Sequence, residues 1–284
     1  TITVGIPCYN MAHWIGEAIQ ALLAQTMQPT EILIVDDCST DDLEGALEKF
    51  TDPRIKLFKM ETNQGNVSGN NVMISKATGN FFIPMAADDT LAPDFIERCY
   101  KQFQADPWLG LVATQTDFMD AKGVTVGVDR MGESGIYQSL MSIPAIRNMD
   151  RKNMLNILYY GNQYFGAGMY RTSALREVGG WKRECEVIAD YEMYLALLQR
   201  YDIRVIEEPL THTRMHDNNV SNLTANKTKK PLKELYALAK KPYYTPRMKC
   251  IIATPFYEMK GWSPYISALA GTIKMLTMLG IEHE

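Results

Sequence analysis

The stretch that decides the fold is Asn80-Phe-Phe-Ile-Pro-Met-Ala-Ala-Asp-Asp-Thr-Leu-Ala-Pro-Asp94. Its apolar run Phe81–Met85 is typical of a buried strand, and two adjacent carboxylates, Asp88 and Asp89, follow it. Two acids at the carboxyl end of a buried strand repel each other unless a positive charge lies nearby, and oxygen ligands suit Mg²⁺ or Mn²⁺. The alternative is that these acids only cap the next helix, because Asp is common at helix starts.

The residues around this stretch alternate between predicted strands and predicted helices. Apolar runs predict strands, and apolar residues at helical spacing predict helices between most of them. The predicted strands lie at 2–6, 31–35, 55–60, 81–85, 109–114, 123–128, 166–170, 203–207 and 211–215, and the Asn- and Gly-rich segment 63–71 is predicted to be a loop. Such alternation implies an α/β fold with a mostly parallel sheet that helices cover on both faces.

Polar clusters follow three of the predicted strands. They are Tyr9-Asn10, Asp36-Asp37 and Asp88-Asp89. In parallel sheets covered by helices, ligands bind outside the carboxyl ends of the strands. Three strands that end in such groups on one edge therefore predict a binding site there, with coincidental helix capping as the alternative.

Length, charge and cysteine usage bound the class of protein. The 284 residues are enough for one large domain or for a domain with an appendage, and the net charge of −4 argues against a nucleic-acid partner. The five cysteines are scattered without a CxxC pair, which fits a reducing compartment, so we expect a cytoplasmic location. We see no signal peptide and no apolar run that could span a bilayer. The chain begins at Thr1, directly in a strand, so we expect it could be a piece of a longer protein.

The second half offers fewer signals. Residues 129–165 have weak periodicity and are predicted to be a loop-rich region that sets substrate specificity. Asp190 opens an amphipathic helix and could be only a favourable first-turn acid, and His216 in its polar loop could be only a solvated side chain. Two amphipathic helices are predicted at 249–261 and 265–279, which could pack on the domain, form a homodimer contact or lie on a membrane surface.

Several motifs taken together resemble the family 2 glycosyltransferases. They occur in the family's order over residues 1 to about 222. The motifs are Val4-Gly-Ile-Pro-Cys-Tyr-Asn10, Gln25-Thr26, Glu31-Ile-Leu-Ile-Val-Asp-Asp-Cys-Ser-Thr-Asp41, Asn63-Gln-Gly65, Ala77-Thr-Gly79, the strand into Asp88-Asp89, Gly179-Gly180-Trp181, the helix start at Asp190, Arg214-Met-His216 and Asn219-Val-Ser221. The resemblance implies a GT-A fold, a Rossmann-like domain that uses a nucleotide-sugar donor, with a UDP-sugar favoured, and Mn²⁺ or Mg²⁺.

The resemblance also implies a role for individual residues. Asp190 matches the catalytic base, and Trp181 matches an acceptor-binding position. The matched nucleotide-binding positions are Pro7, Tyr9, Asn10, Asp37, Asn63, Asn71 and Asp88, and the matched metal-binding positions are Asp88, Asp89 and His216. Physically, the ring of Tyr9 offers a face to a base, and the carboxylate of Asp37 can accept the N3–H of a uracil.

The implied reaction is an inverting displacement at the anomeric carbon, with a glycan or lipid-linked acceptor, in polysaccharide or glycoconjugate biosynthesis. We expect a GT-A domain over residues 1–225, made of a nucleotide-binding half (1–115) and an acceptor-binding half (116–225). A helical C-terminal extension is expected over 226–284, and through it the chain could be peripheral to a membrane.

The sequence departs from the family pattern at two positions, and the first keeps a second hypothesis open. Ala86 stands where most members carry an Asp, and Ala189 stands where many carry a Glu. A non-catalytic module that binds a nucleotide sugar or a glycan through a decayed metal site is therefore the alternative. A nucleotidyltransferase ranks lower, because segment 7–14 has no Lys or Arg to bind a triphosphate.

Overall fold

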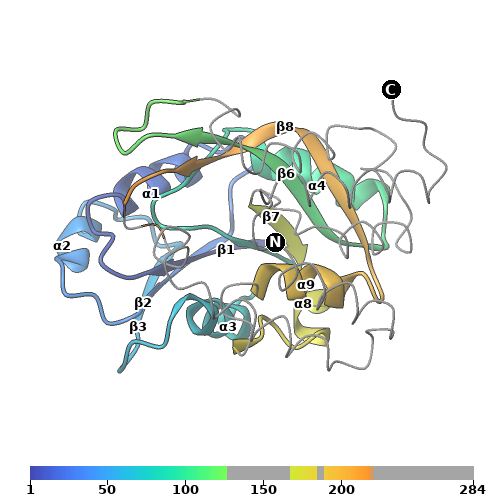
Figure 1. Cartoon of the computed structure of the whole chain (residues 1–284), viewed down its shortest axis with the longest axis horizontal. Helices are drawn as coiled ribbons and strands as arrows, with labels where there is room; N and C mark the ends of the chain where they lie inside the picture. Colours follow the sequence, from blue (N-terminus) through green and yellow to red (C-terminus); the bar gives the residue numbers. More distant parts are fainter. Residues whose placement is uncertain (127–166, 184–188, 218, 220–284) are drawn as a thin grey trace, which may run out of the picture.

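The computed structural model describes residues 1–126, 167–183, 189–217 and 219, and the remaining residues are the grey trace in Figure 1. The predictions for the loop-rich region 129–165 and for the helices of the extension 226–284 lie outside the described residues. The division into two halves and an extension therefore stays a prediction. None of the described helices is long and apolar enough to cross a bilayer.

An eight-stranded sheet runs through the described part of the chain, in the order β3-β2-β1-β4-β7-β6-β8-β5 (Figure 1). β3, β2, β1 and β4 are parallel, β7 is antiparallel to both of its neighbours, and β8 is parallel to β6 but antiparallel to β5. The strands are β1 (Ile2–Cys8), β2 (Glu31–Asp36), β3 (Ile55–Lys59), β4 (Phe81–Pro84), β5 (Thr90–Leu91), β6 (Leu109–Met119), β7 (Gly168–Arg171) and β8 (Asp202–Arg214). The sheet is therefore mixed, and its continuous parallel part, β3-β2-β1-β4, comes from the first third of the chain.

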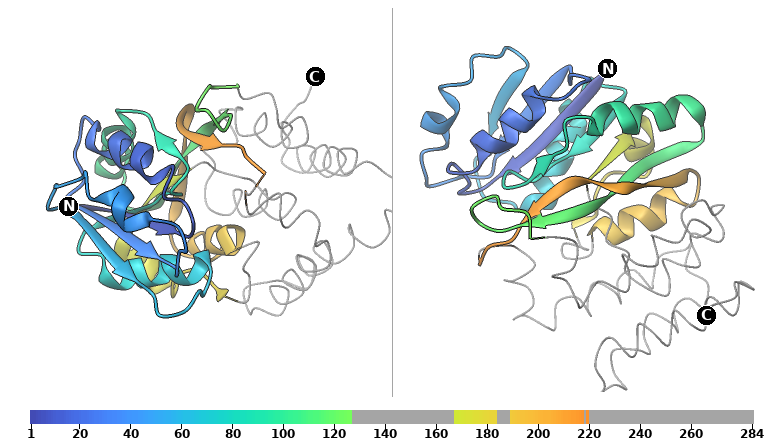
Figure 2. Two further views of the ribbon diagram at one scale, coloured as in Figure 1. Left: turned by 90° about the vertical axis from the view of Figure 1, so that its left-hand side faces the viewer. Right: turned by 90° about the horizontal axis from the view of Figure 1, so that it is seen from above.

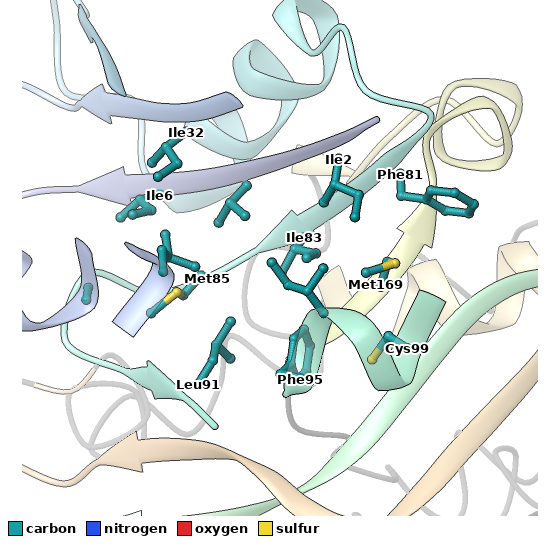
Figure 3. Close-up of a cluster of buried hydrophobic side chains, with 14 of the residues drawn as sticks. Ile2, Ile6, Ile32, Phe81, Ile83, Met85, Leu91, Phe95, Cys99 and Met169 are labelled. Carbon is teal, nitrogen blue, oxygen red and sulfur yellow. The ribbon is translucent and has the colours of Figure 1, made fainter. Parts of the chain in front are cut away.

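Helices cover both faces of the sheet, as the unbroken apolar strands require. Every residue of β2 is buried, a pattern that forms where a strand is covered on both sides. Side chains of α1 (Ile15–Leu23) and α4 (Phe95–Ala105) belong to the core on one face, and those of α3 (Asn66–Lys76), α8 (Thr172–Glu177) and α9 (Ala189–Leu197) belong to the core on the other (Figure 1). The short helix α2 (Leu43–Leu47) follows β2. Figure 3 shows the first core, where Ile6, Ile83 and Phe95 lie between β1, β4 and α4.

The start of α3 differs from the sequence prediction. The segment 63–71 was expected to be a loop, but α3 already begins at Asn66. Asp37 accepts the backbone N–H groups of Gln64 and Gly65, which satisfies donors just before the helix. Gly69 lets this helix approach the sheet closely, because a Cβ there would lie 3.3 Å from the Cβ of Pro7. Tertiary contacts therefore override the low helix propensity of Asn and Gly.

The last described strand, β8, also differs from the sequence prediction. Two strands were predicted at 203–207 and 211–215, whereas β8 is one strand beside β6 along much of their length (Figure 2). Register shifts around Gln115 accommodate the intervening Pro209. β5, which the sequence did not predict, pairs Thr90 and Leu91 with β8 directly after the two acids. The last described strand is thereby joined to the turn that carries Asp88 and Asp89.

Candidate active site

The three polar clusters lie at one edge of the sheet, as predicted. β1 pairs in parallel with β2 on one side and with β4 on the other, so their carboxyl ends are neighbours. Tyr9–Asn10 follow β1, Asp36–Asp37 end β2, and Asp88–Asp89 come four and five residues after Pro84, the last residue of β4. The topology therefore brings the predicted groups to a single region of the molecule.

Asp88 and His216 form the closest pair of candidate metal ligands. Their Oδ2 and Nε2 atoms are 2.9 Å apart, and both side chains are largely buried. The ring of Trp14, the residue that precedes α1, stacks on the His216 ring with centroids 4.2 Å apart. Stacking and the contact with Asp88 together hold the imidazole in one orientation.

Asp89 makes different contacts from its neighbour. Its Oδ1 accepts the backbone N–H of Arg214 at 2.9 Å, and the Thr213 hydroxyl also bonds to it. Burial and the nearby charge of Asp88 raise the pKa of Asp89 to about 7, although the Arg214 N–H, the Arg214 charge and Thr213 oppose the rise. The structure thus uses Asp89 to join β8 to the acidic turn, while Asp88 is the carboxylate that meets His216.

Arg214 joins the acidic turn to the segment after β6 and to α1. It was not predicted as a site residue, although its motif was part of the family resemblance. It is 1% exposed. Its Nε donates to the Asp88 carbonyl at 2.9 Å, one terminal nitrogen donates to the Ala121 carbonyl at 3.2 Å, and the other bonds Glu17 at 2.5 Å. The sequence did contain a signal for Arg214. It is a single arginine near the end of a predicted strand, and the adjacent acids Asp88 and Asp89 need a positive charge nearby.

Asp37 is occupied by backbone donors. The carboxylate is buried, and its two oxygens accept from Gln64 N and Gly65 N at 2.7 Å each. Its own N–H donates to the Cys8 carbonyl at 2.8 Å. Each carboxylate oxygen can still accept a second hydrogen bond. The predicted uracil contact therefore stays a prediction, next to an observed role in holding the start of α3.

The other predicted nucleotide-binding residues are either exposed to solvent, as Tyr9 and Asn63 are, or built into the end of β1 and the turn just after it, as Pro7 and Asn10 are. Tyr9 is 47% exposed, so its ring is available to a ligand, and Asn63 is exposed as well. Pro7 is half-buried in β1. Asn10 has a φ of 56°, and its side-chain oxygen accepts the Thr40 N–H at 2.7 Å, so it fastens the loop after β2 to the end of β1.

Asn71, Trp181 and Asp190 form a connected chain of hydrogen bonds. Asn71 accepts the Trp181 N–H at 2.9 Å and donates to the Trp181 carbonyl at 2.8 Å. The indole N–H of Trp181 then donates to Asp190 Oδ1 at 2.8 Å. Trp181 is 3% exposed, so this placement does not support the predicted acceptor contact, and Asn71 is engaged with Trp181 rather than left open to a nucleotide.

Asp190 lies in the first turn of α9, as predicted. Its residue keeps solvent-exposed surface, while its carboxyl group is closely surrounded by protein. The resulting desolvation raises its pKa, and the hydrogen bond from Trp181 partly offsets that rise. Among the described residues only Trp181 bonds this carboxyl, through Oδ1. A carboxylate with a raised pKa and an oxygen that can accept a proton has the properties of a general base.

The residues present fit a small divalent cation that is also held by a ligand's phosphates. Among the described residues no three of His, Cys, Asp and Glu gather into a complete metal site. Mg²⁺ commonly takes only one or two protein carboxylates and completes its octahedron with waters and phosphates. Asp88 Oδ2 and His216 Nε2, which bond each other at 2.9 Å here, would be the protein ligands of such a cation once that shared proton is released. Ala86, where the family pattern has an acid, is exposed in the same turn.

The fold and this edge match the class of α/β proteins in which ligands bind outside the carboxyl ends of parallel strands. The model of the family "Glycosyl transferase family 2" matches residues 3–179, and the chain belongs to this family. The family resemblance seen in the sequence is thereby confirmed. Asp190, Arg214 and His216 lie beyond the matched segment, so their placement comes from the structure.

Relatives in sequence include a chondroitin synthase of Pasteurella multocida (strain Pm70) and a hyaluronan synthase of Pasteurella multocida. Each is 24% identical over 222 residues, which are 78% of this chain and 21% of the relative. This chain therefore spans about a fifth of the length of these curated relatives.

Solved structures with a similar fold include S. aureus TarS 1-349, with a TM-score of 0.66, 18% identity and coverage of 97% of this chain and 80% of that one. Another is the mannosyltransferase PcManGT from Pyrobaculum calidifontis in complex with GDP-Man and Mn²⁺, with a TM-score of 0.59, 18% identity and coverage of 100% and 76%. These likenesses confirm the predicted GT-A fold.

Proposed function

We propose that the chain is a metal-dependent inverting glycosyltransferase that moves a sugar from a UDP-sugar to an acceptor hydroxyl in the synthesis of a polysaccharide or glycoconjugate. The observation that carries this proposal is the 2.9 Å contact between Asp88 Oδ2 and His216 Nε2, two residues 128 positions apart in the sequence. It lies at the edge where the parallel strands end. Family membership supports sugar transfer, and TarS was also solved with UDP and with UDP-GlcNAc.

The donor would bind along this edge. The exposed ring of Tyr9 offers a stacking face for the base, and the Asp37 carboxylate retains acceptor capacity for the N3–H of uracil. Asp88 and His216 would hold the cation, which when bound would stabilise the charge of the departing diphosphate as a Lewis acid. Trp14 and Arg214 would keep that pair in place by the stacking and hydrogen bonds described above.

Asp190 would act as the base. As the acceptor oxygen forms its bond to the anomeric carbon, the bond from that carbon to the diphosphate oxygen breaks, and the configuration inverts. The acceptor hydroxyl proton passes to the free oxygen of the Asp190 carboxylate, and the nucleoside diphosphate leaves with the bonding electrons. General base catalysis of this kind contributes about 10²–10⁴ in rate.

Donor and metal use can be tested by thermal shift. We expect a UDP-sugar with Mn²⁺ to raise the melting temperature more than either alone, by about RT ln(1 + [L]/Kd) in free energy. His216→Ala should remove the metal-dependent part of this shift. His212→Ala is the matched control, because His212 lies on β8, four residues before His216, and its ring faces Asp117 instead of Asp88. Equal nucleotide binding with and without metal would refute the cation site.

Transfer itself is tested with Asp190→Asn. We expect the variant to lose sugar transfer and keep metal-dependent donor binding nearly intact. Unchanged turnover would refute the base assignment. If the wild-type chain binds a UDP-sugar but neither hydrolyses nor transfers the sugar, the non-catalytic binding module that Ala86 left open is the correct description.

A further inference from the structure

Two glycines form the turn before Trp181, and their backbone conformation fixes the position of the Trp181 backbone. Gly179 and Gly180 have φ values of +83° and +67°, a backbone conformation that residues other than glycine rarely adopt. A Cβ on Gly180 would lie 2.4 Å from Asn71 Oδ1, so this glycine is also needed for close approach to α3. Both features favour the hydrogen bonds between Asn71 and the Trp181 backbone.

The Trp181 side chain is fixed as firmly as its backbone. Its ring is 3% exposed and packs edge-on to Tyr170 and Phe82, with centroids 5.6 Å and 6.5 Å away. An indole has a single donor and no acceptor, so a ring held in this way can point its N–H in only one direction. That direction is toward Asp190 Oδ1, at 2.8 Å.

From this geometry we infer that Trp181, clamped by Asn71, is a positioning residue that orients the Asp190 carboxylate and reserves one of its oxygens for the acceptor. The inference rests on the proposed role of Asp190 as the base. The indole N–H occupies Oδ1 and thereby fixes the rotation of the carboxylate, so Oδ2 is the oxygen left to take a proton. The same bond stabilises the charged form of the carboxylate and favours a base that is ionised before the acceptor arrives.

Trp181→Phe separates this role from simple packing, because it keeps an aromatic ring and removes the N–H. A hydrogen bond to a charged group corresponds to about 10- to 100-fold in an equilibrium or a rate. We therefore expect kcat to fall by about 10- to 100-fold while the KM for the donor stays within about twofold. We also expect the acidic limb of the pH profile to move to higher pH, because the bond that lowers the Asp190 pKa is lost and only desolvation remains.

Two further variants sharpen the test. Trp108→Phe is the matched control, because Trp108 is 67% exposed in the turn before β6, and we expect unchanged kinetics. Asn71→Ala should reproduce both the lower kcat and the shifted pH limb, and its effect should not add to that of Trp181→Phe, since the two residues act as a unit. A raised donor KM with an unshifted pH limb in Asn71→Ala would instead indicate direct nucleotide binding and overturn the clamp.

The outcomes distinguish this inference from the proposed function. If Asp190→Asn is inactive but Trp181→Phe keeps the wild-type kcat and pH profile, the positioning role of Trp181 is wrong and the base assignment stands. If Asp190→Asn is fully active, the base assignment itself fails. Melting temperature and donor binding are measured for every variant, so a misfolded protein is recognised before its kinetics are interpreted.

Discussion

Replacing Asp37 with Asn is expected to lower the free energy of unfolding by about 3 kcal/mol. The buried carboxylate accepts one backbone N–H on each oxygen, from Gln64 and from Gly65, at 2.7 Å in both cases. An Asn side chain keeps one acceptor and turns a donor toward the second N–H. The variant therefore loses a hydrogen bond to a charged group, about 1.5–3 kcal/mol, and leaves a part-buried backbone N–H without a partner, at the low end of about 1–3 kcal/mol.

The assay is unfolding in urea, supported by thermal melting. In a chain of this size 3 kcal/mol corresponds to a melting temperature about 6–12 °C lower. Asp36→Asn is the matched control. Asp36 is equally buried, but only its Oδ1 accepts a backbone N–H, from Ser39 at 2.8 Å, and an amide oxygen can take that place. An Asp37→Asn protein as stable as wild type, or two variants with equal losses, would refute the account of how α3 is held.

Three other outcomes follow from the structure. Desolvation raises the pKa of Asp190, so its carboxylate becomes protonated at a higher pH than an ordinary aspartate, whose pKa is 3.8. The acidic limb of the kcat/KM profile should therefore lie above pH 3.8. A limb at or below pH 3.8 would contradict a desolvated base. Arg214→Met should cost about 3 kcal/mol of stability in urea, because it leaves the buried Asp88 carbonyl without its donor and removes the bonds to Ala121 and Glu17. Glu17→Gln should cost under about 1 kcal/mol, since that side chain is half exposed and its amide oxygen can still accept from Arg214. Burial raises the pKa of the Cys8 thiol to about 12, so alkylation at pH 8 followed by mass spectrometry should modify the half-buried Cys38 well before Cys8, and the reverse order would contradict this burial.

The parallel half of the sheet could be predicted because its signals are local. Each of the strands β1, β2 and β4 is an apolar run that polar residues follow. Once those strands are parallel, their carboxyl ends must share an edge. The clustering of the three polar groups therefore followed from topology alone.

The contacts made by individual side chains could not be predicted in the same way. Asp37 and Asp89 both carry carboxylates of the expected type, yet both bind backbone N–H groups. The bonds between Asn71 and Trp181 span 110 residues, and no local pattern encodes that distance. Likewise α3 begins early because Asp37, far away in sequence, accepts donors before its first turn.

The buried Arg214 also has a consequence for the order of folding. Its ion pair with Glu17 joins residues 197 positions apart, and the contact between His216 and Asp88 spans 128. Contacts of such sequence separation carry a large loop-closure entropy and form slowly. The parallel strands can assemble before β8 docks, so a chain that emerges amino-terminus first has its acidic strand ends before it has the imidazole. After dilution from denaturant, recovery of helical signal should therefore precede recovery of the proposed metal-dependent nucleotide binding.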